Sequence, residues 1–440
     1  MTPTANIARW KVGVTASTLL LFAFVLRIWN LATPKGFIFD EVYYAKNAHS
    51  LVQHGVELQD GGSAEFIVHP PVGKWLIGLG IKSFGFNEFG WRISAAVIGA
   101  LSVALIFFVA KRLFDSYLLA TSAGVLMSLD GLHLVHSRVA LLDIFLMFFI
   151  LLSFYFLLIS KPWLASIALG LAVATKWSGI YYMVAFGAFA LYSDYRLEKA
   201  IESESPIRNV AVRKLWRRLL QYGVLPILVY VASWAGWFLT SSGWDRKWSP
   251  SIVKSFLHYH SEMWNFHTNL TDAHAYSANP WSWLIMVRPT SFFYASPKGC
   301  GSSSCSQEIL ALGTPLLWWS GLVALFVTFG YWIARREWQS GLILLGFAAG
   351  YLPWFLMQKR TMFTFYAITF EPFVILVIIF ALSKFLESNK DGVIPRIRLY
   401  TVFAYMALVA INFFYFLPLY IGSVISYSAW FHHMWIPSWI

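Results

Sequence analysis

Residues 92–110 read RISAAVIGALSVALIFFVA, and this segment decides the class of fold. Its one charge, Arg92, stands at the start, and the rest is apolar or small. A run of about 18 or more such residues can cross the hydrocarbon core of a bilayer as a helix. Ten more segments resemble it, of which the fourth and fifth are short and could form one kinked unit: 14–31, 117–135, 140–159, 162–177, 179–193, 221–240, 313–334, 338–356, 363–382 and 399–420. The sequence therefore predicts an all-α polytopic membrane protein with about eleven transmembrane helices.

The composition agrees with a chain that is dissolved mostly in lipid. Of the 440 residues 58% are hydrophobic and 12% are charged, whereas soluble domains carry roughly 25% charged residues. The first span is too long for a secretory signal, and no small-residue cleavage site follows it. No linker, internal repeat or soluble module interrupts the chain, so we expect residues 1–440 to form a single membrane domain.

Lysine and arginine residues predict the orientation, because cytoplasmic connections carry an excess of them. Seven of these residues fall within 194–218, which we assign to the cytoplasm. Alternation then places the N-terminus inside, the C-terminus outside, and the two large segments 32–91 and 241–312 outside. The net charge of +12 is therefore a topology signal, and it gives no reason to expect nucleic acid as a partner. We expect a multi-pass protein of the cell membrane with its active site on the extracytoplasmic face.

Histidine is confined to this outer face, which marks it as the working face. The pairs His258/His260 and His432/His433 could bind a metal, but no acidic ligands accompany them, so we expect none. The eleven histidines are His49, His54, His69, His133, His136, His258, His260, His267, His274, His432 and His433.

The two cysteines, Cys300 and Cys305, also fall in an outer segment. Their close spacing in an oxidising compartment favours a disulfide over a metal site. Two free thiols remain the alternative.

An acidic pair follows the first span in the stretch FIFDEVYYAK, residues 37–46. Charges at or inside spans are costly and usually functional. A cluster of cations suits a phosphate, and a carboxylate beside it suits a general base. A blander interpretation exists, because an arginine at a span end can extend to lipid headgroups and Asp40 could cap a helix that begins at Glu41. Besides Asp40 and Glu41, the charges in question are Arg92, Asp130, Arg138, Asp143, Lys176, Arg360 and Glu371.

The ordered set of motifs resembles one known family. FDEVYYAK, HPPVGKWL and WRIS are similar to the first outer loop and second span of protein O-mannosyltransferases, and the later motifs are similar to the actinobacterial branch. Those later motifs are HSRVALLD, ATKWSGIYY, HAYSANPWSWLIMVRPTSFFY, CGSSSCSQEILALGTPLLWW and KRTMFTFYA. The resemblance covers almost the whole chain. It implies a C-type glycosyltransferase fold, with interfacial helices in the outer loops, and a polyprenyl-phosphate-mannose donor. Segment 241–312 is far too short for the β-trefoil insert of fungal and animal members.

The resemblance also implies roles for single residues. Asp40 and Glu41 match the acidic pair of the family, whose first acid is held to be the catalytic base. Substrate-binding roles are implied for the residues that match its other motifs, which are His69, Arg92, Arg138, Asp143, Lys176 and Arg360. We expect His69, as part of the HPP motif, to shape its loop, and we favour this role over direct participation in the reaction.

The chemistry needs a base for a Ser or Thr hydroxyl and cations for the departing phosphate, because a lipid phosphate leaves without an acid. Asp40 is the expected base, in an inverting attack, and Arg138, Lys176 and Arg360 are expected to hold the phosphate. Glu41 could orient Lys74 or Arg92 or help to position the acceptor. No cofactor is expected, since the lipid-linked donor is a substrate.

The expected partners are polyprenyl-phosphate-mannose, secreted or membrane polypeptides with Ser and Thr, and membrane lipids, with the export machinery as a further candidate. A sister C-type transferase with a lipid or cell-wall glycan acceptor is the main alternative, because only the acceptor differs. A transporter is the third hypothesis, but it predicts repeated halves and charges in mid-membrane. Here the charges gather at the outer edge.

Overall fold

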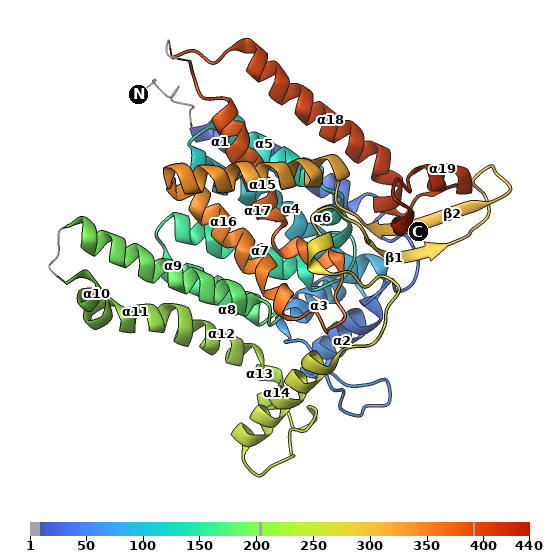
Figure 1. Ribbon diagram of the computed structural model, residues 1–440. Helices are drawn as coiled ribbons and strands as arrows, with labels where there is room; N and C mark the ends of the chain where they lie inside the picture. The colour runs from blue at the N-terminus through green and yellow to red at the C-terminus, as the bar shows by residue number, and fades with distance from the viewer. Residues whose placement is uncertain (1–8, 202–204, 390–391) are drawn as a thin grey trace.

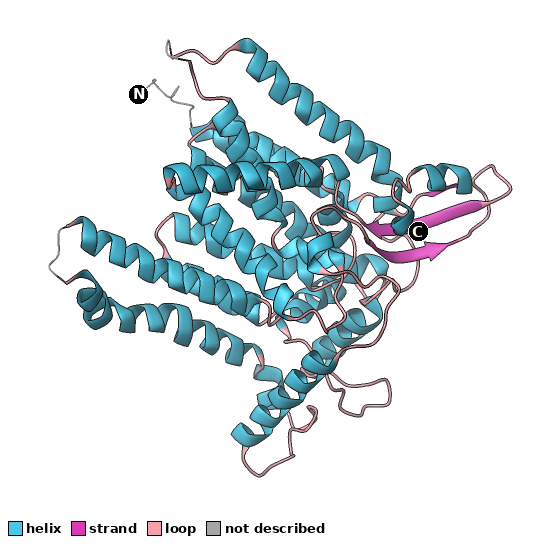
Figure 2. Cartoon of the chain, viewed as in Figure 1, coloured by secondary structure: helices cyan, strands magenta, loops and turns pink. Residues whose placement is uncertain are grey.

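The computed structural model describes residues 9–201, 205–389 and 392–440, and helices dominate it (Figures 1 and 2). Each of the eleven predicted spans coincides with a helical segment. The principal helices of these segments are α1 (Arg9–Ile28), α4 (Glu88–Phe114), α5 (Tyr117–Ser128), α7 (Asp143–Leu158), α8 (Pro162–Val173), α9 (Gly179–Ala200), α12 (Leu225–Ser233), α15 (Pro315–Arg335), α16 (Trp338–Tyr351), α17 (Glu371–Phe385) and α18 (Arg396–Ile421). The predicted helical membrane architecture is confirmed.

The helices differ in length and in the surface they expose. Among the described residues, five helices are long and apolar enough to cross a membrane: α1, α4, α15, α18 and the helical stretch Trp338–Leu356, which contains α16. Helices α5 and α8 have 12 residues each, about 18 Å of rise, against roughly 30 Å of hydrocarbon. Helix α5 is continued by the short α6 (Gly131–His136) after a break at Leu129 and Asp130.

The segment before the seventh span is a nearly continuous helical run. It consists of α10 (Pro206–Asn209), α11 (Leu215–Leu219) and α12, joined by π-helical turns at Val210–Lys214 and Leu220–Val224, and α13 (Ala235–Leu239) follows it. Three ion pairs tie this run to the end of α9, because Lys214 contacts Asp194 and Glu198 and Arg218 contacts Asp194. The basic segment therefore packs against its own span.

The core lies where α4, α7 and α17 meet. The buried face of α17 runs without a break from Glu371 to Phe380, and nearly all of α7 from Asp143 to Ile150 is buried as well. A helix that is apolar all round belongs in the interior. Helix α18 lies instead at the periphery of the bundle (Figure 1), where many of its large side chains are exposed, as expected of a lipid-facing helix.

The outer loops gather at one end of the bundle. Helices α2 (Glu41–His54) and α3 (Val72–Phe84) come from the first loop, and α14 (Ile252–Asn269) comes from the second. Figure 1 shows them at the end opposite to the one where α9 finishes. Loop 194–218 and the two large segments 32–91 and 241–312 therefore lie at opposite ends of the bundle, and which end faces the cytoplasm stays a prediction. The predicted cytoplasmic N-terminus begins in residues 1–8, which lie outside the described part of the chain, as do 202–204 of the basic loop.

A three-stranded antiparallel sheet was not predicted. It has the order β1-β2-β3, with β1 (Thr290–Ala295), β2 (Cys305–Ala311) and β3 (Val424–Ser426), and α19 (Tyr427–His432) follows it. Thr290 pairs with Ala311, and Ser426 pairs with Cys305. Cys300 and Cys305 form a disulfide in the β1–β2 hairpin. The sheet joins the second outer loop to the segment after the last span, so the outer end is not built of helices alone.

Candidate active site

Asp40 lies immediately before α2, which begins at Glu41 as the acidic pair suggested. It occupies the N-cap position, but its side chain makes no capping hydrogen bond. Its backbone carbonyl instead accepts hydrogen bonds from the N–H groups of Tyr43 and Tyr44. A capping residue would direct its carboxylate to the N–H of Val42 or Tyr43. The Asp40 carboxylate therefore does not cap the helix, and it lines a cavity.

Two cavities of different character meet beside Asp40. The first, here called the aromatic cavity, has a volume of about 260 Å³ and is lined largely by apolar and aromatic side chains, including Trp177, Tyr181 and Trp354. The second, here called the polar cavity, has a volume of about 600 Å³ and is lined by Asp40, Asn47, Glu65, Asp272 and His274 together with several aromatic rings. Asp40 lines the polar cavity and does not line the aromatic one.

The two cavities share one stretch of wall, which we call the junction. It contains two cations, Lys176 and Arg360. The Lys176 ammonium pairs with Asp143 at 2.8 Å, and it lies 5.4 Å from the centre of the Tyr366 ring. The junction residues are His69, Lys176, His267, Arg360 and Tyr366. Predicted residues from three distant motifs, the HPP loop, the Lys-Trp pair and the late outer loop, therefore come together here.

Arg360 is held on one side and left free on the other. Its Nη2 lies 3.5 Å from Nδ1 of His267, whereas its buried Nε has no hydrogen-bond partner within the described chain. The His267 Nε2 lies 2.7 Å from the carbonyl oxygen of Val68 and donates to it in the tautomer that leaves Nδ1 as an acceptor. A guanidinium needs partners for its N–H groups when it is buried. The unused Nε therefore suits an anionic ligand at the junction.

Close packing brings the HPP loop to Lys176. The N–H of Val72 donates to the carbonyl of Ala174 at 3.0 Å. At Gly73 a side chain would meet Leu142 at 2.7 Å and Thr175 at 3.1 Å, so a larger residue would have to displace these side chains. Lys74 donates to the carbonyl of His69 at 3.0 Å and forms an ion pair with Glu57. Lys74 thus fixes the loop that carries His69, and it does not pair with Glu41.

Burial tunes the titratable groups outside the spans. It raises the pKa of Asp40 to about 6, with Lys176 opposing the shift. Burial lowers the pKa of His69 well below its ordinary value, and the neighbouring cations lower it further. It lowers the pKa of His267 to about 4. Near pH 7 both histidines are therefore neutral, and Asp40 is mostly ionised yet basic enough to accept a proton.

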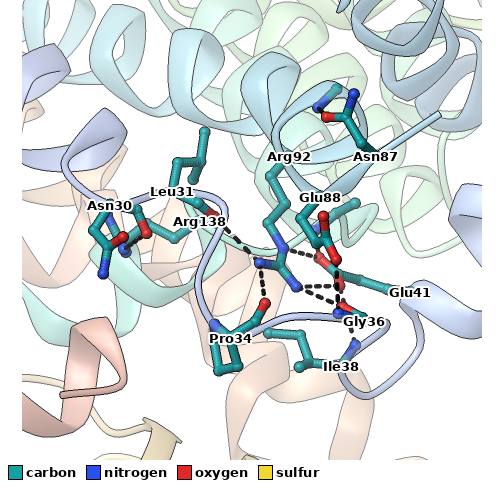
Figure 3. Close-up of polar contacts among 12 residues, drawn as sticks. Asn30, Leu31, Pro34, Gly36, Ile38, Glu41, Asn87, Glu88, Arg92 and Arg138 are labelled. Carbon is teal, nitrogen blue, oxygen red and sulfur yellow. Dashed lines mark hydrogen bonds and ion pairs between the residues drawn. The ribbon is translucent and has the colours of Figure 1, made fainter. Parts of the chain in front are cut away.

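Glu41 and Arg92 form a buried ion pair away from both cavities (Figure 3). Glu41 Oε1 accepts from Arg92 Nε at 2.8 Å and from the N–H of Ala140 at 3.0 Å. Oε2 accepts from Arg92 Nη2 at 2.8 Å and from the N–H of Ile38 at 3.0 Å. Arg92 also donates to the carbonyls of Leu31, Pro34 and Gly36. The ion pair matches the expectation that Glu41 could orient Arg92, and together they fix the loop in front of α2. Neither side chain lines either of the two cavities, so this geometry gives no support to a reacting role for Glu41 or to substrate contact by Arg92.

Arg138 is also placed differently from the prediction. Its guanidinium donates to the carbonyls of Arg27 at 2.8 Å and of Trp29 at 2.7 Å, just where α1 ends. It lines neither cavity. The last carbonyls of a helix have no partners of their own and favour a cation. Arg138 therefore caps α1, and it does not line the junction where we expect the phosphate.

Sequence reasoning overlooked His267 and Tyr366 as site residues. His267 was noticed only as one of eleven outer histidines, and no spacing singled it out. The helical position of His267, two turns after His260 on α14, carries no motif of its own. Within the described residues no group of three or more His, Cys, Asp or Glu side chains could hold a metal ion.

Comparisons with known proteins identify the family of the chain. The sequence model of the family described as dolichyl-phosphate-mannose-protein mannosyltransferase matches residues 17–238. The model of the C-terminal four TMM region of protein-O-mannosyltransferase matches residues 252–439. Polyprenol-phosphate-mannose–protein mannosyltransferase of Mycobacterium tuberculosis is 33% identical over 98% of this chain and 92% of its own length. The enzyme of that name from Corynebacterium glutamicum is 30% identical over 97% and 93%.

Solved structures show the same fold. The S. cerevisiae protein O-mannosyltransferase Pmt1-Pmt2 complex bound to the sugar donor gives a TM-score of 0.82 at 16% identity, covering 98% of this chain and 93% of that one. ArnT from Cupriavidus metallidurans bound to undecaprenyl phosphate gives 0.55 at 16% identity, covering 93% and 71%. The C-type glycosyltransferase fold is thereby confirmed. The chain belongs to the protein O-mannosyltransferase family of membrane enzymes.

Proposed function

We propose that this enzyme transfers mannose from polyprenyl-phosphate-mannose to Ser or Thr hydroxyls of polypeptides on the outer face of the cell membrane. The observation that carries the proposal is the meeting of two unlike cavities at Lys176 and Arg360, with Asp40 lining only the polar one. A lipid-linked donor needs an apolar place for its tail, and a protein acceptor needs one that is open to water. The printed names of the relatives support the same donor and acceptor.

The aromatic cavity suits the lipid end of the donor. Trp177, Tyr181, Trp354 and Met357 provide an apolar lining, and aromatic side chains of this kind are favoured at membrane interfaces. The donor phosphate then lies at the junction, where Lys176 and the unpaired Nε of Arg360 provide positive charge. Arginine binds phosphate as a planar fork and lysine binds it as a point charge. These two cations neutralise the leaving phosphate, and this proposal needs no cofactor.

Asp40 is the proposed general base. An acceptor hydroxyl in the polar cavity loses its proton to the Asp40 carboxylate while its oxygen bonds to the anomeric carbon. The bond between that carbon and the phosphate oxygen breaks, and polyprenyl phosphate leaves with the electron pair. The base and the leaving group stand on opposite sides of the sugar, so the configuration inverts. Glu41 and Arg92 take no part in these steps except by holding the loop that carries Asp40.

The orientation is part of the proposal. The basic segment at the end of α9 and the site stand at opposite ends of the bundle, and basic segments favour the cytoplasm (Figure 1). The site then faces outside, where exported polypeptides emerge with polar side chains accessible. Contact with the export machinery would follow from this position.

Transfer by the purified protein tests the function. It is incubated in lipid nanodiscs with radiolabelled polyprenyl-phosphate-mannose and a peptide that carries one Thr. We expect label on the peptide that β-elimination releases, and none on a matched peptide with Thr→Ala. A parallel incubation uses membranes that contain lipid, glycan and peptide acceptors together. Label that appears there only in lipid or glycan would replace this function with that of a sister transferase.

A further inference from the structure

A third cavity lies along α2, beside the helix face next to the one that lines the polar cavity. It has a volume of about 680 Å³, and we call it the lateral cavity. Lys46, His49 and Gln53 of α2 line it, together with Gln59, Asp60 and Phe86. These α2 residues follow the spacing of one helix face, whereas Tyr43, Tyr44 and Asn47 on the neighbouring face line the polar cavity. The two cavities therefore lie beside neighbouring faces of one helix.

The wall between these two cavities is thin. Glu65 lines both of them, and its Oε2 accepts a hydrogen bond from Asn47 at 2.8 Å. Glu65 belongs to the loop segment 57–65, where Leu58 and Ala64 form a β-bridge. The polar cavity that holds Asp40 and the lateral cavity are therefore neighbours that share the Glu65 side chain.

The lining of the lateral cavity offers unused hydrogen-bonding capacity. The ring of His49 is stacked on Phe86 with a centroid distance of 4.2 Å and an interplanar angle of 15°. This contact fixes the ring, yet its buried Nδ1 has no partner within the described chain. Gln53 is exposed at the rim, and Lys46 lies 3.8 Å from Asp60. Donors, acceptors and aromatic rings line this cavity together, with little of the continuous apolar surface that a lipid tail needs.

We propose that the lateral cavity binds the segment of the acceptor polypeptide that flanks the reactive Ser or Thr. The distance supports this partner. From Asp40 to His49 and Gln53 the helix rises by about 14 to 20 Å, which an extended peptide covers in about four to six residues. A backbone N–H of that segment would satisfy Nδ1 of His49. This inference rests on the proposed function and names a second contact region for its acceptor.

Peptide length tests the inference. A series of peptides carries one Thr and zero to eight further residues on one side, and a second series carries them on the other. We expect KM to fall at least fivefold, on one side only, when the flank reaches about four to six residues. A KM that is independent of flank length beyond two residues would overturn the inference while leaving the transfer reaction intact. If no peptide of either series is mannosylated, the proposed function itself fails.

A variant pair separates this contact from a general effect on folding. Gln53→Trp narrows the lateral cavity, and Ser83→Trp places the same ring at another exposed position, on α3. The ratio of kcat/KM for a long peptide to that for a short peptide should fall at least fivefold in Gln53→Trp and should keep its value in Ser83→Trp. Equal ratios in the two variants would contradict the proposal.

A cross-link gives a readout that does not depend on turnover. A peptide with Cys five residues from its Thr, on the favoured side, should form a mixed disulfide with Gln53→Cys and not with Ser83→Cys. Equal cross-linking of both variants, or of neither, would count against the lateral cavity. If a lipid headgroup or a glycan occupies the lateral cavity instead, that compound would reduce the labelling of Gln53→Cys by a small thiol reagent, and an unreactive acceptor peptide would not.

Discussion

Replacing Glu41 by Gln should damage the fold far more than its mild chemistry suggests. The carboxylate accepts four hydrogen bonds, two on each oxygen, and every donor is an N–H group. Whichever way a Gln amide turns, its NH₂ group faces two N–H donors. The charge of Arg92 is also left buried without a counter-ion. Removing one partner of a buried pair costs about 3–5 kcal/mol, so we expect a loss of stability of that size.

The measurement is thermal stability in detergent, followed by loss of the monodisperse peak in size-exclusion chromatography. Glu88→Gln is the matched control, because Glu88 is near the same loop and its ion pair with Lys35 is exposed on the lysine side. An exposed pair is worth about 0–1 kcal/mol, so this control should stay close to wild type. A Glu41→Gln protein with the wild-type thermal midpoint and no transfer activity would refute the reasoning. Glu41 would then be a reacting group after all.

Three further predictions follow from the site. The rate of transfer should fall about tenfold per pH unit below pH 6 and level off above it, because burial raises the pKa of Asp40 to about 6 and the base must be ionised; a rate that is flat down to pH 5 would exclude Asp40 as the base. Arg360→Lys keeps the charge but loses the planar fork of the guanidinium, so turnover should fall about tenfold or more, which is about 1.4 kcal/mol of activation free energy. Arg138→Lys should lower stability and leave the KM for the donor unchanged. The opposite pattern would indicate that Arg138, and not Arg360, binds the phosphate. In intact cells an impermeant thiol reagent should label Ser63→Cys and spare Ser205→Cys, and equal labelling of both would overturn the orientation.

The class of fold and the start of α2 could be predicted from the sequence. Long apolar runs have few alternatives in a folded chain, and an acidic pair at the lip of a span predicts a helix start. The direction of a charged side chain could not be predicted in the same way. Arg92 and Arg138 both stand at the outer edge, as the sequence suggested, but backbone carbonyls at the end of α1 and in the loop after it bind them. Unpaired carbonyls leave no trace in a sequence.

The site was predictable only in part for a related reason. Lys176 and Arg360 are charged residues without an acidic residue close to them in the sequence, which indicated a functional role. Both line the junction. His267 reaches the same place from α14 through a contact with Val68, 199 positions away in the chain. Such a contact depends on tertiary packing, and no local sequence pattern predicts it. The small sheet escaped notice because β1 and β2 are short and lie beside apolar spans of similar composition.

The central claim is that Asp40 is the base, and Asp40→Asn tests it most directly. Asn is nearly isosteric with Asp and is itself favoured at a helix N-cap, so the start of α2 should survive. It cannot accept the proton, so we expect transfer of mannose to a Thr peptide to fall by roughly 10²–10⁴. Binding of polyprenyl-phosphate-mannose should remain, because Lys176 and Arg360 provide the phosphate contacts, and Asp115→Asn at the exposed C-terminal end of α4 serves as the control. Transfer at a near wild-type rate by a folded Asp40→Asn protein would contradict the account.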